Sequence, residues 1–390
     1  MLLTIITFVL VLGILVFAHE IGHFVSAKRL GVCVEEFGFG LPPRIIGTYK
    51  DPATKKWKIA GIKTRTRGAT IYSFNWIPLG GFVKIKGEQG ENPEEEDSFS
   101  HKSIAKRIFI LSSGVAMNVI LALGILTLGF IIGLPREINE KEINSRWAKI
   151  KDEKIYVTDV LQDYPAEKAN IKPNDIILAI NDIAFSDILK LQEYTNIHAK
   201  ETLKISLERN HKKITAELSP KIEKDGRALM GVLLSKMGIV SYPWYIAIWE
   251  GAKATVYLIK EIIIAFIMLF KNLIIAKKAI IELSGPVGIA IITGEVARMG
   301  IIYILQFTAI LSLNLAIINF LPFPALDGGR VLFLCLEKIR GRAINARIES
   351  YIHNIGLYLL FLLVIVITYN DILRFSDKFI HLWGRITQLF

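Results

Sequence analysis

Four long uncharged stretches constrain this 390-residue chain more than any other feature. They run from Met1 to Ala18, from Ile108 to Pro135, from Met299 to Leu326, and from Ser350 to Asn370, which contains one histidine, His353. Each of them approaches or exceeds the 20 mainly apolar residues that a helix needs to cross a bilayer. The chain is therefore expected to be a multi-pass membrane protein.

The composition supports this class and excludes others. Hydrophobic residues make up 52% of the chain and charged residues 21%, with a net charge of +11. An apolar content this high excludes an intrinsically disordered chain, and two cysteines are too few for a disulfide scaffold. Basic cytoplasmic loops give membrane proteins a positive balance. The net charge is thus no reason to expect a nucleic-acid partner, and we expect none.

The first apolar stretch has the position of a signal peptide, and a fifth apolar segment is interrupted by charges. The first stretch lacks the positive start and the cleavage site of a signal peptide, so we expect a retained helix over residues 1–30. The fifth, Ala254 to Ala276, is interrupted by Lys260, Glu261 and Lys271. We interpret residues 243–290 as an amphipathic segment in the membrane interface, with a fifth span as the alternative.

The charges of the loops predict an orientation. The segment from Lys28 to Arg107 carries 15 Lys and Arg residues. The loop after the third stretch carries five more: Arg330, Lys338, Arg340, Arg342 and Arg347. Cytoplasmic loops are enriched in this way, and four spans place both loops on the same side. Both termini and the region from Arg136 to about Pro243 are then predicted to lie outside the cytoplasm. Cys33 and Cys335 fall near the cytoplasmic side.

Residues 153–235 have the alternating pattern of a soluble α+β domain. Half-buried strands are expected at Ile155–Val160 and Leu203–Leu207, and a buried strand at Ile176–Ile180. A short helix is expected after Pro165, followed by a turn at 172–174.

This run resembles the bacterial, circularly permuted PDZ domain. Asn170 and Asn174 stand where that domain usually has glycine, and Asn tolerates the left-handed conformation better than most residues. PDZ domains bind extended peptide ends by adding a strand to a sheet edge. Peptide binding and a purely steric filter remain alternative roles for the insert.

The chemistry of the chain is indicated by His19-Glu20-Ile21-Gly22-His23. On a helix, residues four apart share a face. Two imidazoles so placed can bind one zinc ion, and the glutamate can act as a general base. These ionisable groups end an apolar helix, where each costs about 2.5–3.5 kcal/mol at mid-bilayer. They therefore call for a compensating partner.

The third stretch supplies a candidate partner. A catalytic zinc site needs a third protein ligand and one open position. Asp327 is the first charge after 28 uncharged residues, and it follows Pro322 and Pro324, which break the helix. We predict Asp327 as the third ligand.

Together the two motifs resemble the site-2 protease family of intramembrane zinc metalloproteases (peptidase M50B), over nearly the whole chain. The first helix carries H-E-x-x-H, and the third carries N-x-x-P-x-P-x-L-D-G from Asn319. The closest resemblance is to the bacterial RseP/RasP-like group, which has a PDZ insert and regulates extracytoplasmic stress responses. The resemblance implies that His19, His23 and Asp327 are zinc ligands. It also implies that Glu20 is the general base and that Asn319 helps to hold the substrate.

Within the loop of residues 31–103, two segments resemble the family's membrane-associated β-hairpin. They are Phe37–Gly40 and Pro78–Gly81, and the alternation over Thr70–Phe74 supports strands. An extended edge near the zinc would pair with an unwound substrate, and the alternative is a loop that only covers the site. Ser284–Gly288 matches a further family stretch without a chemical role.

The predicted fold is thus a mainly α membrane protein with about four transmembrane helices, a membrane-associated β-hairpin and one inserted extracytoplasmic PDZ-like α+β domain. The spans are expected over residues 1–30, 104–135, 299–326 and 350–370. The implied location is the bacterial inner membrane, with the active site near the cytoplasmic side.

The predicted activity is zinc-dependent cleavage of single-span membrane proteins, such as anti-sigma factors or signal-peptide remnants, in regulated intramembrane proteolysis. Two alternatives are a catalytically silent membrane scaffold that presents a PDZ domain, and a metal transporter. Transporters usually contain inverted repeats, and none is evident in the sequence. A zinc assay and a metal-uptake assay would distinguish the three functions.

Overall fold

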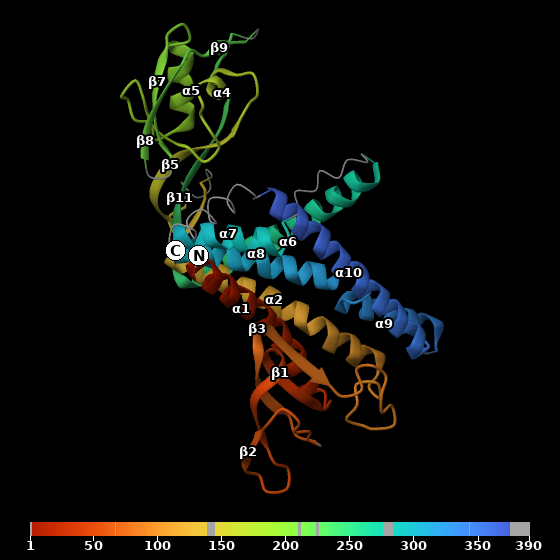
Figure 1. Cartoon of the computed structure of the whole chain (residues 1–390). Coiled ribbons are helices and arrows are strands. Elements are labelled where there is room, and N and C mark those ends of the chain that lie inside the picture. The colour runs from red at the N-terminus through yellow and green to blue at the C-terminus, as the bar shows by residue number, and fades with distance from the viewer. Residues whose placement is uncertain are drawn as a thin grey trace, which may run out of the picture. The chain divides into compact units, whose positions relative to one another are not determined.

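The computed structural model (Figure 1) describes residues 2–66, 68–138, 145–209, 212–223, 226–275, 284–342 and 344–374. The chain forms two compact units. The first, here called the membrane unit, comprises Met1–Leu126 and Gly251–Phe390, and the second, the insert, comprises Thr127–Glu250.

Among the described residues, four helices are long and apolar enough to cross a membrane. They are α1 (Leu2–Arg29), α2 (Ile104–Ile132), α8 (Ile301–Phe320) and α10 (Ala346–Arg374). The predicted class, a mainly helical membrane protein with four spans, is confirmed. The fifth apolar region lies in one long helix, α6 (Trp244–Ile275), which is not among the four. Its place in the interface stays a prediction, and residues 276–283 lie outside the described ones.

Two of the spans end earlier than the uncharged stretches do. Helix α2 stops at Ile132, because Gly133 takes a left-handed φ of 123° and strand β4 (Leu134–Glu137) follows. Helix α8 stops at Phe320, where Pro322 and Pro324 cannot continue its hydrogen bonds. The basic segment after it is a second helix, α9 (Asp327–Arg340), where the sequence suggested a loop.

A helix that the sequence did not separate, α7 (Pro286–Met299), precedes α8, and Gly300, with φ 118°, divides the two. The backbone N–H of Gly288 donates a 2.7 Å hydrogen bond to the buried Asp371 carboxylate of α10. An anion at a helix N-terminus is stabilised by the free N–H groups there. The Ser284–Gly288 stretch therefore fastens α7 to the last span.

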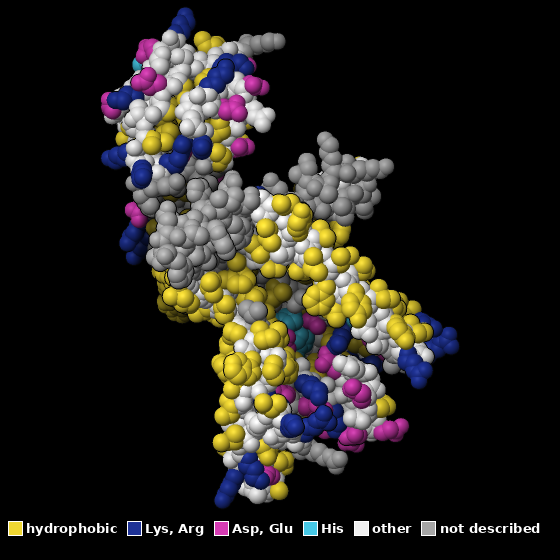
Figure 2. Space-filling model, in the orientation of Figure 1, with side chains coloured by type: hydrophobic (Ala, Val, Ile, Leu, Met, Phe, Trp, Pro, Cys, Tyr) yellow, Lys and Arg dark blue, Asp and Glu magenta, His cyan; other side chains and the backbone are white. Residues whose placement is uncertain are grey.

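The expected hairpin is part of a three-stranded sheet, ordered β2 (Trp57–Ala60), β1 (Val34–Lys50), β3 (Ile71–Ile85). Both long strands bend, so that Phe37 pairs with Tyr72 and also with Val83. Figure 2 shows yellow apolar side chains over this sheet. The large exposed ones are Leu41, Ile45, Ile46, Trp57, Ile59, Tyr72, Phe74, Trp76 and Ile77. Apolar patches this extensive mark interaction or membrane surfaces, which supports the predicted association with the membrane.

The sheet packs on α1 through aromatic rings and glycine. The rings of Phe24 and Phe37 stack 4.7 Å apart, and those of Phe17 and Phe37 lie 5.4 Å apart. A Cβ on Gly80 would lie 2.6 Å from a methyl group of Val16. Only a glycine therefore lets this turn of β3 approach α1 one helical turn before Glu20.

The insert is built on a six-stranded sheet in the order β4-β11-β5-β6-β7-β8. Its further strands are β5 (Lys149–Val160), β6 (Ile176–Ile180), β7 (Leu203–Arg209), β8 (Lys212–Leu218) and β11 (Val232–Ser241). Helices α4 (Pro165–Lys168) and α5 (Ile188–Ile197) and a small pair, β9 (Lys221–Ile222) and β10 (Ala228–Leu229), complete it.

The insert confirms the strands and the short helix that the sequence predicts. It begins before residue 153 and ends after 235, because β4, β5 and β11 extend the sheet at both ends. Asn170 and Asn174 adopt left-handed φ values of 57° and 72°, as expected of residues that replace glycine. Its core is a cluster of aliphatic side chains in which Ile180, Leu191 and Leu203 are fully buried.

Candidate metal centre

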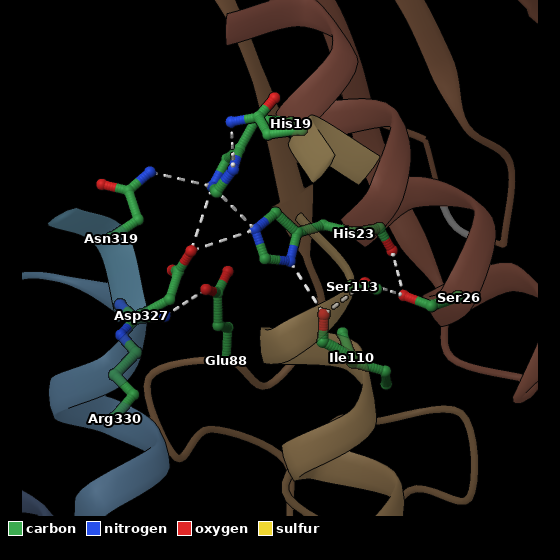
Figure 3. A network of polar contacts seen from close by, with 10 residues as sticks. His19, His23, Ser26, Glu88, Ile110, Ser113, Asn319, Asp327 and Arg330 are labelled. Atoms are coloured by element: carbon green, nitrogen blue, oxygen red, sulfur yellow. Dashed lines mark hydrogen bonds and ion pairs between the residues drawn. The ribbon is translucent and has the colours of Figure 1, made fainter. Parts of the chain in front are cut away.

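Three predicted ligands meet in the membrane unit, between α1 and the start of α9 (Figure 3). His19 and His23 are buried, and their ring nitrogens and a carboxylate oxygen of Asp327 all lie within 4.8 Å of one another. The histidines share a face because they are four residues apart on α1. Asp327 is the first residue of α9, where a carboxylate is stabilised by the helix N-terminus.

The separations of these atoms match a tetrahedral zinc site. Oδ2 of Asp327 lies 3.0 Å from Nε2 of His19 and 3.3 Å from Nε2 of His23, and the two Nε2 atoms are 3.2 Å apart. Ligands about 2.0–2.1 Å from a zinc ion at the centre of a tetrahedron are separated by roughly 3.3 Å. The three atoms thus form one face of such a tetrahedron and leave its fourth vertex free.

The outer nitrogen of His23 is held by the backbone of α2. Nδ1–H of His23 donates to the carbonyl oxygen of Ile110 over 2.9 Å. A hydrogen bond at one ring nitrogen fixes the tautomer and leaves the other nitrogen with a free lone pair. His23 therefore presents an unprotonated Nε2 to the centre.

The outer nitrogen of His19 likewise has a partner on α2, the side-chain amide of Asn118. Its amide nitrogen lies 3.4 Å from Nδ1 of His19, and its buried Oδ1 has no hydrogen-bond partner among the described residues. Rotating the amide by half a turn lets Oδ1 accept the Nδ1–H of His19. That arrangement satisfies the orphaned oxygen and frees Nε2 of His19 for a metal, so the residues present fit a zinc ion.

Close crossing of α1 and α2 makes room for the two imidazoles. A Cβ on Gly114 would lie 2.4 Å from Nε2 of His23 and 2.8 Å from the ring of His19. A Cβ on Gly22 would lie 2.2 Å from the carbonyl oxygen of Ser113. The hydroxyls of Ser26 and Ser113 bond across the same crossing at 2.7 Å. Small residues thus let α1 and α2 pack closely at the site itself.

A cavity of about 220 Å³ opens beside His19 and Asp327 and is also lined by the other predicted site residues, Glu20 and Asn319. Nδ2 of Asn319 lies 3.4 Å from Nε2 of His19. No described residue donates a hydrogen bond to the Glu20 carboxylate, and a Cβ on Gly81 of β3 would lie 3.9 Å from Glu20. Glu20 is therefore free to act as a base, next to the turn of the sheet.

A second cavity, of about 340 Å³, lies between the sheet and α1. Its lining is almost entirely apolar and includes Phe17, Phe37, Phe39, Ile46, Tyr72 and Phe74. Phe17 precedes Glu20 by three residues on α1, so the two cavities border the same helix.

The turn before Asp327 is held from α10. Ala325 takes a left-handed φ of 78°, and its N–H donates to Nδ1 of His353 over 2.9 Å. A Cβ on Gly356 would lie 2.5 Å from Pro324, so α10 is in close contact with this turn. One turn along α9, Arg330 forms an ion pair with Glu88, which follows β3.

The structure therefore brings together all five predicted site residues: His19, Glu20, His23, Asn319 and Asp327. Sequence reasoning missed the Ile110 carbonyl, Asn118, His353 and the Glu88–Arg330 pair. Asn118 and His353 did carry a signal, because each is a strongly polar residue within an apolar stretch. A backbone carbonyl carries none.

Comparison with known proteins shows what the chain is similar to. Residues 7–363 match the family model described as Peptidase family M50. A zinc metalloprotease RasP of Geobacillus kaustophilus is 29% identical, over 95% of this chain and 98% of its own. The regulator of sigma-W protease RasP of Bacillus subtilis is 28% identical over similar shares, 95% and 98%. A putative zinc metalloprotease of Clostridium acetobutylicum is 30% identical, over 93% and 96%.

Among solved structures, the PDZ domain of an SdrC-like protein from Listeria monocytogenes is 26% identical to part of this chain. It covers 22% of this chain and 92% of its own, with a TM-score of 0.21.

Proposed function

We propose, from the premise that this chain belongs to peptidase family M50, that it is a zinc-dependent endopeptidase that cleaves single-span membrane proteins within the bilayer. It is a multi-pass membrane metalloprotease. Beyond the class of enzyme, we propose the residues that perform the reaction, the class of substrate and the side of the membrane on which cleavage takes place.

The single observation that carries the proposal is the triangle of His19, His23 and Asp327 inside a helical membrane protein. These residues hold the zinc ion in the proposal. When bound there, a zinc ion would supply Lewis-acid chemistry that polarises the scissile carbonyl and activates water. The buried setting and the fixed imidazole tautomers orient the ligands before the substrate arrives.

Glu20 is the general base in this mechanism. Its carboxylate lines the same cavity as the ligands and has no competing hydrogen bond from a described residue. It accepts the proton of the attacking water and passes it to the leaving amide nitrogen. Asn319 borders the cavity on the opposite element, α8, and its amide N–H groups are placed to hold the substrate carbonyl.

The substrate is an unwound segment of a single-span membrane protein. A helix conceals its peptide bonds in intramolecular hydrogen bonds, so cleavage requires extended backbone. The sheet turn at Gly80–Gly81 beside Glu20 supports strand pairing with such a segment. The largely aromatic lining of the cavity between α1 and the sheet supports the proposal that apolar substrate side chains bind there. Because one relative is named a regulator of sigma-W protease, an anti-sigma factor is the proposed substrate, with signal-peptide remnants as a second source.

We place the active site near the cytoplasmic side of the bacterial cell membrane. The support is the basic charge of the loops between Lys28 and Arg107 and after the third span. The insert is then extracytoplasmic, where it acts as a PDZ-like gate that admits trimmed substrates, either by binding their new ends or by excluding bulky domains.

A cleavage assay with the full-length protein tests the proposal. Reconstituted protein is given a tagged single-span substrate, with and without a zinc chelator. Glu20→Gln should retain zinc and lose about 10²–10⁴-fold in rate, the usual contribution of a general base. Glu261→Gln, at an exposed carboxylate of α6, is the matched control and should cleave normally. Undiminished cleavage by Glu20→Gln would contradict the mechanism. Zinc uptake into vesicles without cleavage would favour the transporter.

A further inference from the structure

The two helices that follow the metal centre form a hairpin whose tip is strongly basic. Helix α9 (Asp327–Arg340) ends at Gly341 in a left-handed conformation, and α10 begins at Ala346. Four basic side chains at or beside this tip are exposed: Lys338, Arg340, Arg342 and Arg347. Figure 2 shows dark blue side chains gathered at this end of the helical pair.

These four residues differ from the basic residues on the inner face of the same hairpin region. Arg330 is paired with Glu88, and Arg107 of α2 is paired with Glu337 of α9 at 2.5 Å. None of the four tip residues has an acidic partner within the described part of the chain. The protein thus neutralises its inward-facing arginines and leaves a cluster of four positive charges for a partner outside itself.

Beside the tip, α9 has an exposed apolar stripe. Leu332, Cys335, Leu336 and Ile339 are spaced i, i+3, i+4 and i+7, which places them on one face of the helix. All four are exposed, and Ile339 has 81% of its surface accessible. The opposite face is the packed one, with Leu334 buried against α2 and its neighbours.

The occupant that matches both features is the anionic surface of a bilayer leaflet. A helix of 14 residues is about 21 Å long, too short to cross a hydrocarbon core of about 30 Å. Helix α9 is joined by short turns to the candidate spans α8 and α10. Acyl chains at the edge of the bilayer are therefore the cover that fits its exposed apolar stripe. Basic residues at the end of such a stripe then meet the phosphate layer.

We propose that the α9–α10 tip, formed by Lys338, Arg340, Arg342 and Arg347, is a binding site for anionic phospholipid headgroups, with the stripe Leu332–Ile339 in contact with their acyl chains. Basic loops in general indicate only which side of the membrane is cytoplasmic. The proposed site in addition prefers anionic over zwitterionic lipid. The site is attached directly to the metal centre, since Asp327 is the first residue of α9. Bound headgroups therefore hold the helix that carries one of the three candidate ligands.

The chain supplies its own probe for this proposal. Its two cysteines are Cys33 and Cys335, and Cys335 lies in the exposed stripe. Full-length protein carrying Cys33→Ser is labelled at Cys335 with an environment-sensitive fluorophore and reconstituted in phosphatidylcholine vesicles with 30% phosphatidylglycerol, a fraction chosen for the assay. Quenching is then compared between brominated phosphatidylglycerol and brominated phosphatidylcholine at equal mole fraction.

We expect brominated phosphatidylglycerol to quench with an apparent affinity at least about fivefold higher, the effect of about 1 kcal/mol from one basic residue near an anionic surface. Replacing the four tip residues with Gln should abolish this preference. The matched control replaces Lys190, Lys200, Lys212 and Lys213, which are exposed on the insert, and should retain it.

Equal quenching by the two lipids, in the protein that retains all four basic tip residues, overturns the proposal. The charges then indicate topology only. Absence of quenching by either lipid, or concentration-dependent crosslinking through Cys335, also overturns the proposal, because protein or a second copy then covers the stripe. These readouts do not involve cleavage. Failure of the proposed protease function would leave them unchanged, so the two failures are distinguishable.

Discussion

The membrane unit and the insert each hold a carboxylate in their interior, and the two are neutralised in opposite ways. In the insert, Asp175 is fully buried and accepts hydrogen bonds from Nε and Nη2 of Arg209 at 2.6 and 2.7 Å, and from the backbone N–H of Lys172 at 2.8 Å. In the membrane unit, the Asp327 carboxylate is paired, within the described part of the chain, with the imidazoles of His19 and His23. Its nearest arginine along α9, Arg330, is already paired with Glu88.

This difference distinguishes the structural carboxylate Asp175 from the proposed metal ligand Asp327. Asp175 has its cation within the chain and needs none from solution. Asp327 and its two histidines bring three potential metal ligands within 4.8 Å of one another, and in the proposed function a bound cation neutralises this carboxylate. The same residue type thus stabilises the fold in one unit and is a proposed metal ligand in the other.

The comparison predicts the largest effect for Asp327. Asp327→Ala should abolish both zinc binding and cleavage, because two histidines alone leave the metal without its anionic ligand. Zinc per chain is measured by atomic absorption after purification. Asp175→Ala, which removes the buried carboxylate of the insert, is the control. It should retain stoichiometric zinc in whatever fraction of the chain stays folded.

The second effect concerns stability in the insert. Arg209→Met leaves the buried Asp175 without its cation and should destabilise the insert by about 2–3 kcal/mol. This is below the usual cost of breaking a buried pair because a quarter of the Arg209 side chain is exposed. Protease susceptibility of the insert in the full-length protein measures it. An unchanged cleavage pattern, or a loss of zinc from the membrane unit, would refute the division between the two sites.

A third, smaller effect is expected at Asn118. Asn118→Ala removes the amide beside Nδ1 of His19 and should weaken zinc affinity by about 10–100-fold, as loss of an outer-layer partner of a ligand does. Competition with a chelator of known affinity measures the change. Asn314→Ala, on α8, is a matched control, because among the described residues that side chain bonds only its own helix, at Ile310. Equal affinities for the two variants would remove Asn118 from the site.

The smallest effect is a pH dependence of the insert. Burial alone would raise the pKa of Asp175, but hydrogen bonds from Arg209 and the Lys172 amide lower it below its ordinary value. A lowered pKa in the folded state contributes stability that is complete above the unfolded pKa of about 3.9 and is lost as the pH falls through the folded value. Pepsin sensitivity of the insert should therefore rise below about pH 4. Asp175→Asn should flatten that rise, and a steeper dependence in the variant would count against the assignment.

Much of the fold could be predicted from sequence because membrane spans and alternating strands are local patterns. The four apolar stretches became four helices, and the run Ile176–Ile180 is the strand β6 with the same bounds. The helix ends were less predictable. Gly133 and Gly300 stop or divide helices inside uncharged stretches, where hydropathy does not change.

The site residues likewise fall into those that local sequence predicts and those that depend on contacts between distant helices. His19, Glu20 and His23 are adjacent in sequence, and Asp327 is conspicuous as a charge after an apolar run. Asn118 and His353 act on the site through contacts between helices that are distant in sequence, at separations of 99 and 28 residues from their partners. Such contacts depend on helix register, which composition and periodicity do not specify.

The glycine crossing of α1 and α2 has a consequence for how family members are sorted into active and inactive enzymes. Any side chain at Gly114 would occupy the space of the two imidazole rings, and any side chain at Gly22 would push α1 away from α2. A chain with Ala or Val at either position would keep every ligand and the complete H-E-x-x-H signature, yet would fail to assemble the centre. Pseudoenzymes of this type would escape detection by motif, and the diagnostic positions are the two glycines.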